Sequence, residues 1–373
     1  MAEVIVVATK QGRPVSGAEL DINYTILSDR PSSAVAGVET ARAIKAKVSD
    51  VELLMLGSDS AGISAISALG AEMRGQPVGV ASLGVLIAAA DLKAGRLTLP
   101  RHQVIELPIT PLDGLGYRGP VHRDISGRNP DKTSRGPFDI IKLPNRATYL
   151  QASWPVLWSH DHKAETTMTV LPCSEGIERP GMREEALVVW EGRPDWAEHS
   201  IAGATRLHIN NDFRVNSQPV AACLTPVPAI GGRAWPSFRP IPDSGGDAEI
   251  WEKVLCVWLN STPGLLGRWW VSNRQQNGRA NLTVTTMRSI PVLDLRTLTI
   301  EQRQALAEVF DEFASRPMLP ANEAYRDEAR QELDERVLCG VLGLPITILD
   351  PLTTLRLQWC AEPSVHGGKK TRP

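Results

Sequence analysis

Strand-like and helical patterns alternate over the first hundred residues. Short apolar runs predict strands at 4–8, 20–27, 51–56 and 97–100. Apolar residues three or four positions apart predict helices at 30–48 and 80–92, and Gly95 closes the second of these. We therefore expect residues 1–100 to form a small α/β segment.

Residues 101–298 have a different pattern, with frequent Pro, Gly and Trp and only short apolar runs. Turn signals such as Pro180-Gly181 separate the runs, which favours a β-rich domain of irregular strands. One helix is expected at 247–259, where Ile250, Val254 and Trp258 share a face. The expected strands lie at 147–151, 167–171, 186–190, 206–209, 220–224 and 282–286.

The C-terminal part is strongly helical. Thr299 and Gln302 form a capping-box pattern before an apolar stripe that ends at Phe313. A second helix is predicted from about 322 to 342, where Gly343 and then Pro345 end it. Residues 299–345 should form an antiparallel helical hairpin, and 346–373 an extended or disordered tail. The predicted fold class of the whole chain is α+β.

Composition limits the class of protein. With 42% hydrophobic and 22% charged residues, the 373-residue chain can bury a core and is expected to be soluble. Its most apolar window, 78–90, is shorter than the ~20 residues that cross a bilayer, so we expect no membrane partner. The five cysteines are dispersed without a CxxC pair, and no leader-like segment opens the chain, which together favour the cytoplasm.

Charge is divided unevenly, although the net charge is only −2. Residues 260–293 hold four arginines and no acidic residue, and residues 101–150 hold eight basic and five acidic ones. The helical hairpin has the opposite balance, with ten acidic residues and five arginines. This division is typical of a nucleic-acid-facing domain on an acidic support, and ordinary surface charge is the alternative interpretation.

The motifs give no support for catalysis by this chain on its own. GxSxG, P-loop and HExxH patterns are absent. His160 and His162 have no third ligand in view, so a structural or DNA-backbone role is favoured over a metal site. Gly57–Gly62 lacks the GxGxxG spacing and is interpreted as a turn, and Asp139 with Lys142 makes only a weak nuclease pattern. We assign no catalytic or metal-binding residue.

One stretch after residue 268 has the chemistry of a nucleic-acid interface. Arginine can pair with guanine and Asn or Gln with adenine, and an aromatic ring can stack on an unpaired base. Alternatively, the two tryptophans belong to the core and the polar run is a solvated loop. The candidate DNA contacts are Trp269, Trp270, Arg274, Gln275, Gln276, Asn277 and Arg279.

Several sequence blocks follow one another in order around this stretch. They lie at 258–266, which contains Leu-Asn-Ser, and at 274–279, 282–293, 333–337 and 342–344. In this order they resemble the target-recognition region of N6-adenine DNA methyltransferases from restriction–modification and phage-defence systems. Residues 121–232 resemble upstream parts of the same region more loosely, and 3–10 are similar to the last strand of such a methylase domain.

Adenine methylases hold the flipped base with an Asn-Pro-Pro-aromatic loop and bind S-adenosylmethionine on a Gly-rich loop. This chain has neither, since Asn129-Pro130-Asp131 and Asp350-Pro351-Leu352 lack the second proline and the aromatic residue. The resemblance therefore implies a target-recognition module that is not catalytic alone and needs no cofactor of its own. It implies two partners, double-stranded DNA and a methyltransferase catalytic domain or subunit that binds S-adenosylmethionine.

The same resemblance suggests further contacts. Arg118, Arg123 and Arg233 would support binding through phosphates, which position a protein on DNA without specifying sequence. The acidic hairpin would dock on the catalytic part or act as a spacer between half-sites. Two other functions stay open: a degenerate methylase or nuclease enzyme, and a module that binds another protein through the acidic hairpin and ignores DNA.

Overall fold

The computed structural model combines helices with small sheets, which confirms the predicted α+β class. Predicted elements at 20–27, 30–48 and 147–151 lie outside the described residues, as do 58–62, His160 and His162. The structure describes residues 2–8, 51–57, 83–100, 103–118, 138–142, 155–157, 165–172, 185–189, 203–231, 234–240, 247–275 and 278–366.

The described strands pair in small sheets, most of them antiparallel. β1 (Ala2–Ala8) pairs with β2 (Val51–Gly57), which confirms two strands expected near the N-terminus. Two-stranded sheets are also formed by β3–β4 (Arg96–Leu99, Gln103–Glu106), β5–β16 (Ile109–Pro111, Pro291–Leu293), β6–β13 (Tyr117–Arg118, Arg239–Pro240) and β7–β9 (Phe138–Lys142, Glu185–Val189). A three-stranded sheet has the order β10–β12–β8 (Thr205–Ile209, Ala222–Gly231, Val156–Leu157), with a parallel β12–β8 pair.

The helix predicted at 80–92 is α3 (Leu83–Leu92), and β3 follows it as expected. Gly95 has a φ of +78° in the turn between them, a conformation that glycine adopts without steric cost. This local signal was therefore sufficient to place the end of the helix.

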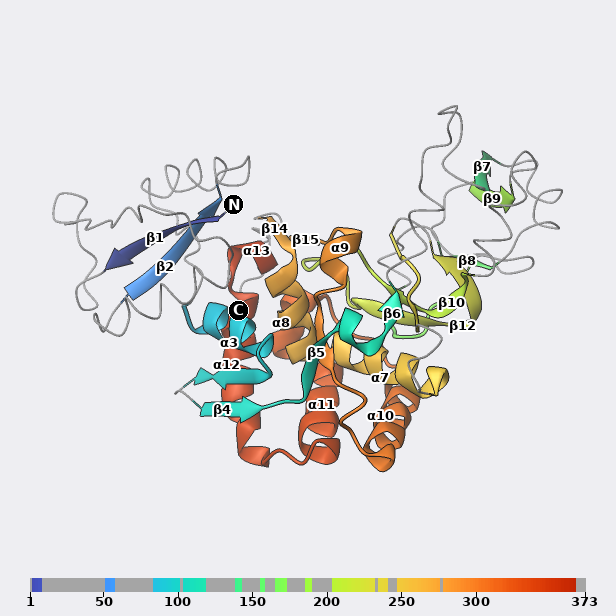
Figure 1. The fold of residues 1–373 in the computed structure, drawn as a ribbon. Coiled ribbons are helices and arrows are strands. Elements are labelled where there is room, and N and C mark those ends of the chain that lie inside the picture. The colour runs from blue at the N-terminus through green and yellow to red at the C-terminus, as the bar shows by residue number, and fades with distance from the viewer. Residues whose placement is uncertain are drawn as a thin grey trace.

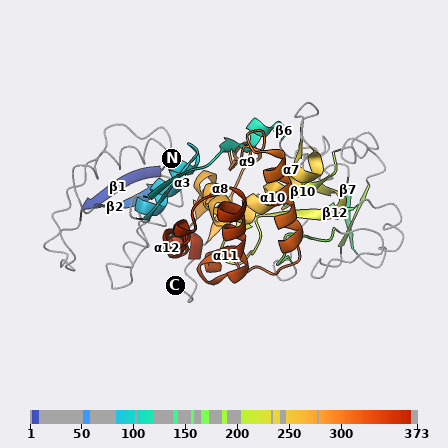
Figure 2. The same cartoon turned by 90° about the horizontal axis from the view of Figure 1, so that it is seen from below.

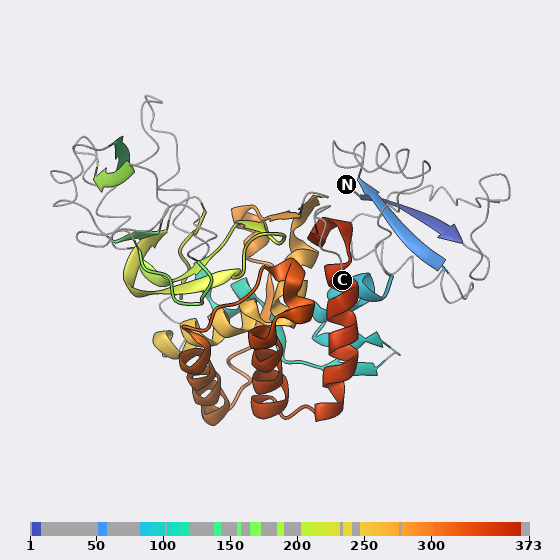
Figure 3. The same cartoon turned by 180° about the vertical axis from the view of Figure 1, so that it is seen from behind.

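Two consecutive helices lie at the centre of the fold (Figure 1). α7 (Ala248–Asn260) contacts α8 (Thr262–Val271), α10 (Ile300–Phe313) and β12, and α8 also contacts α3 and β16. Below them, α10, α11 (Glu328–Asp334) and α12 (Leu349–Cys360) stand side by side in the front and back views (Figures 1 and 3). Seen from below, this row runs from α12 through α11 to α10 (Figure 2).

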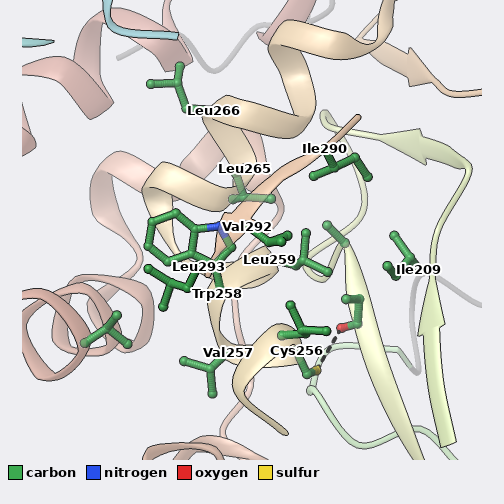
Figure 4. Close-up of a cluster of buried hydrophobic side chains, with 14 of the residues drawn as sticks. Ile209, Cys256, Val257, Trp258, Leu259, Leu265, Leu266, Ile290, Val292 and Leu293 are labelled. Atoms are coloured by element: carbon green, nitrogen blue, oxygen red, sulfur yellow. Dashed lines mark hydrogen bonds between the residues drawn. The ribbon is translucent and has the colours of Figure 1, made fainter. Parts of the chain in front are cut away.

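The core around α7 joins this helix to strands on two sides (Figure 4). Trp258 is fully buried, and its Nε1 donates a hydrogen bond of 3.0 Å to the Pro291 carbonyl of β16. Cys256 is also fully buried and lies 3.5 Å from the Ala222 carbonyl of β12. Burial raises the pKa of the Cys256 thiol far above its usual range, so this group stays protonated.

α7 agrees with the prediction because its start is encoded locally. The Asp247 carboxylate accepts the Glu249 amide at 3.0 Å, which is N-cap geometry. The sequence did not lead us to predict α8, although Ser261 caps it and Pro263 lies in its first turn, both usual start signals. Gly264 is required where the two helices meet, because a Cβ there would overlap the Trp258 carbonyl.

The strand predicted at 282–286 was wrong. Residues Val284–Met287 form a short helix, α9, whose start is a capping box between Thr283 and Thr286. The β-branched residues suggested a strand, but the threonine side chains satisfy the helix amides instead. The strand predicted at 167–171 was also too long, because the structure has a single bridge there, from Thr169 to Leu224.

The C-terminal prediction needs two corrections. The second helix of the hairpin is broken: a 3-10 helix (Ala321–Arg326) precedes α11, and a π-helical stretch (Glu335–Val341) follows it. Asp327 caps α11 and so divides it from the 3-10 helix. The tail predicted as extended or disordered at 346–373 contains α12 and α13 (Pro363–His366). The buried α12 residues recur at the spacing typical of a helix: Leu352, Leu355, Arg356, Trp359 and Cys360.

Candidate nucleic-acid interface

A three-stranded antiparallel sheet holds part of the candidate DNA-binding stretch. In this sheet, β15 (Arg279–Asn281) lies between β11 (Asp212–Arg214) and β14 (Asn273–Gln275). The polar run that could have been one solvated loop therefore contributes two neighbouring strands. Figure 1 shows β14 and β15 at the top of the helical body, on the side opposite α10 and α11.

The register of this sheet sorts its residues into rows that cross the three strands. Residues opposite one another share a face, and successive residues along a strand alternate between faces. Phe213 and Ala280 are each 1% exposed, so their row faces the core. The two flanking rows lie on the opposite, outward face, where Arg214 is exposed and Asp212, Arg279 and Asn281 are half-buried. The three rows are Arg214–Arg279–Gln275, Phe213–Ala280–Arg274 and Asp212–Asn281–Asn273.

The predicted contact residues are only partly brought together. Gln275 and Arg279 are direct cross-strand neighbours in the first row, whereas Arg274 belongs to the row of Phe213 and Ala280. In the register of the sheet, Gln275 therefore shares a row with Arg279 and Arg214, and Arg274 belongs to a different row. Gln276 and Asn277, between the two strands in sequence, lie outside the described residues.

Arg279 is held in place by an ion pair within the sheet. Its Nη2 lies 3.4 Å from Oδ2 of Asp212, and the two side chains are 34% and 39% exposed. A pair this open to water contributes little to stability, at most about 1 kcal/mol. Its main effect is to restrict the orientation of the Arg279 side chain.

Arg268 lies beneath the sheet and joins it to α8. Its side chain is buried, its Nη2 donates to the Ala280 carbonyl at 3.3 Å, and its guanidinium carbon lies 5.2 Å from the centre of the Phe213 ring. Burial lowers the pKa of Arg268 to about 9, and the Asp212 carboxylate acts in the opposite direction. The guanidinium is thus still charged at neutral pH, and the cation–π contact offsets part of its desolvation.

A turn of β11 supports the end of the β14–β15 hairpin. Gln218 holds this turn through two hydrogen bonds. Its side-chain Oε1 accepts the main-chain amide of Arg214 at 2.6 Å, and its main-chain amide donates to the Arg214 carbonyl at 2.8 Å. Gly278, with a φ of +77°, packs against Asn216 in the same turn. A Cβ at Gly278 would lie 2.6 Å from Cγ of Asn216, so both the conformation and the contact require glycine.

The two tryptophans at the start of the candidate stretch are core residues. Trp269 is 2% exposed and Trp270 is 4% exposed, at the end of α8. The Trp269 indole donates a hydrogen bond of 3.0 Å to the hydroxyl of Ser364 in α13. Neither ring has a face open for stacking on a base, which supports the alternative interpretation of these residues as core.

Of the three arginines expected at phosphates, the structure describes only Arg118. Arg118 is in β6, where it lies opposite Arg239 of β13. Arg123 and Arg233 lie outside the described residues. Arg118 is therefore in a different sheet from Arg279.

Residues from the Leu-Asn-Ser block complete the core rather than a surface. The Asn260 side chain is fully buried; its Oδ1 accepts the Ala221 amide and its Nδ2 donates to the Ala222 carbonyl, both at 2.8 Å. Arg330 donates to the Pro219 carbonyl at 2.8 Å and to the Asn260 carbonyl at 2.5 Å. Burial lowers the pKa of Arg330. These bonds fix the turn between α7 and α8 against β12 and α11.

Asp334, from the block at 333–337, meets the same turn from the other side. Its carboxylate accepts the Thr262 amide at 2.8 Å and the Thr262 hydroxyl at 2.5 Å. Arg356 of α12 donates to it at 2.9 Å, and the whole group is buried. Two blocks that carry the sequence resemblance are thus joined through Asp334, and their role in this structure is to hold α8 in place.

Sequence reasoning missed Arg214 as part of this surface. The Phe213-Arg214-Val215 alternation is a weak strand signal, and we did not predict β11 from it.

Among the described residues, no group of three His, Cys, Asp or Glu side chains is arranged to hold a metal ion. No helix in the same ranges is long and apolar enough to cross a membrane.

Comparisons with known proteins give a structural match at low sequence identity. No protein-family model and no curated protein matches the chain. A solved structure similar to this chain is that of the type IIG restriction endonuclease BpuSI, with a TM-score of 0.40 and 11% sequence identity. The match covers 83% of this chain and 36% of that enzyme, so the chain spans about a third of its length.

Proposed function

We propose that this chain is a DNA target-recognition module of an N6-adenine DNA methyltransferase system that acts in restriction or phage defence. The sequence blocks between 258 and 344 and the acid-free basic stretch at 260–293 support this function. The proposal depends mainly on the outward row that joins Arg214, Arg279 and Gln275. Residues of these types bind phosphates and base edges, and they are neighbours in one row of the sheet.

The β14–β15 hairpin is the proposed base-contacting element. A two-stranded ribbon fits the major groove of B-DNA, which is about 12 Å wide. In this arrangement Gln275 pairs with adenine and Arg279 with guanine. Gln276 and Asn277 are further candidates, while Arg118, Arg123 and Arg233 contact phosphates. Trp269 and Trp270 are left out because they are buried.

Methylation belongs to a partner in this proposal. A catalytic domain or subunit with an Asn-Pro-Pro-aromatic loop binds S-adenosylmethionine and flips the adenine, while this chain selects the site. The acidic helices α10 and α11 are the proposed docking surface for that partner. This chain alone has no catalytic role in the proposal.

Selection from randomised duplexes tests the function. The immobilised chain should enrich a short motif in which an adenine and a guanine lie one or two base pairs apart. This spacing is expected because neighbouring strands are about 4.8 Å apart and stacked base pairs rise about 3.4 Å. The Gln275→Ala variant should lose the preference for adenine and retain the guanine. Duplexes recovered without any enriched motif would contradict a target-recognition role.

A further inference from the structure

Arg214 differs from the other arginine in its row. It is exposed on β11, an edge strand of the sheet, and its main chain is fixed by the turn that Gln218 holds. Arg279 has the Asp212 carboxylate beside it, whereas the Arg214 guanidinium has no ion-pair partner in the described part of the chain. Its charge is therefore not neutralised locally, and its backbone is held in one position.

The width of the row gives Arg214 a place relative to a bound duplex. Three adjacent strands span about 10 Å from the first to the third, which is close to the width of the major groove. If β14 and β15 lie over the bases, the edge strand β11 lies over the wall of the groove. The groove wall consists of phosphates rather than base edges.

We infer that Arg214 is a DNA-binding residue that contacts a backbone phosphate and sets the position of the hairpin in the groove. This inference rests on the proposed function and adds a contact that the sequence did not indicate. It divides the row into two roles, with Arg214 at the backbone and Gln275 and Arg279 at the bases. Removal of a phosphate contact lowers the affinity for all sequences equally, whereas removal of a base contact changes the preferred sequence.

The Arg214→Ala variant tests this division of roles. Its affinity for the selected duplex and for an unrelated duplex should fall by the same factor, roughly tenfold. The slope of log affinity against log salt should become shallower by about 0.9, the value expected for one lost phosphate contact. Arg214→Lys should restore the slope, because a lysine ammonium binds phosphate as a point charge.

The matched control is Arg336→Ala, which removes an exposed arginine that pairs with Glu312 of α10, on the opposite side from β14. It should leave affinity and slope unchanged. The Arg214 contact would be overturned if the unsubstituted chain binds DNA and the Arg214→Ala variant has the same affinity and the same salt slope. That result would leave the proposed function intact. A selective loss of the preferred duplex would also overturn it. If the unsubstituted chain binds no DNA, the proposed function fails and the Arg214 contact fails with it.

Discussion

The free energy of unfolding of the Asp334→Ala variant is expected to be about 3–5 kcal/mol lower than that of the unsubstituted chain. Asp334 is fully buried and accepts three hydrogen bonds, two from Thr262 and one from Arg356. Removing the carboxylate leaves the buried Arg356 guanidinium without its charged partner. No opposite charge then compensates the cost of removing the guanidinium from water, which is why breaking a buried ion pair is strongly destabilising. Urea denaturation measures the change.

Glu312→Ala provides the control for this prediction. It breaks the Glu312–Arg336 pair, whose atoms lie 3.0 Å apart but whose side chains are 42% and 53% exposed. Water already screens both charges, so this loss should stay below about 1 kcal/mol. Equal effects of the two substitutions would show that Asp334 does not hold α8, and the structural role assigned to the resembling blocks would be wrong.

The second large effect is expected from Gln275→Ala combined with Arg279→Ala. A good bidentate base contact is worth about 1–3 kcal/mol, so losing two should weaken binding to the preferred duplex by about 2–6 kcal/mol. Even the lower value is a loss of about 30-fold. Fluorescence anisotropy with a labelled duplex measures it, and denaturation of the same variant checks that it is folded.

Arg274→Ala is the comparison for that variant, since Arg274 belongs to the row of Phe213 and Ala280. It removes a positive charge from the same hairpin and leaves the row of Arg214, Arg279 and Gln275 unchanged. Its effect on affinity should be clearly smaller than that of the double variant. A larger loss from Arg274→Ala would mean that DNA meets the other face of β14, and the proposed surface would have to be reassigned.

The predictable parts of the fold are those with local signals. The Asp247 cap of α7, the Thr299 capping box of α10 and Gly95 after α3 each involve residues within one or two turns. Their hydrogen bonds form within the same segment, so the sequence pattern was sufficient to place them. α8 and α12 carried similar signals, and only their interpretation was incomplete.

The candidate site depends on contacts that no local pattern contains. β11 pairs with β15 across a long separation, and this pairing alone decides that Arg214 stands beside Arg279. The bond from Thr262 to Asp334 likewise joins residues 72 positions apart. Residue types pointed to a DNA-binding chemistry near 274–279, but they did not separate Arg274 from Gln275, because the face of a strand depends on its partners.

The central claim is that this chain binds duplex DNA through a basic surface on the outward face of the β11–β15–β14 sheet. The most direct test is the affinity of the unsubstituted chain for duplex DNA, measured by anisotropy at increasing salt concentrations. With Arg214 and the three other arginines proposed at phosphates, the slope of log affinity against log salt should be about −3.6. Absence of binding at low salt, or an affinity that does not change with salt, would contradict the account.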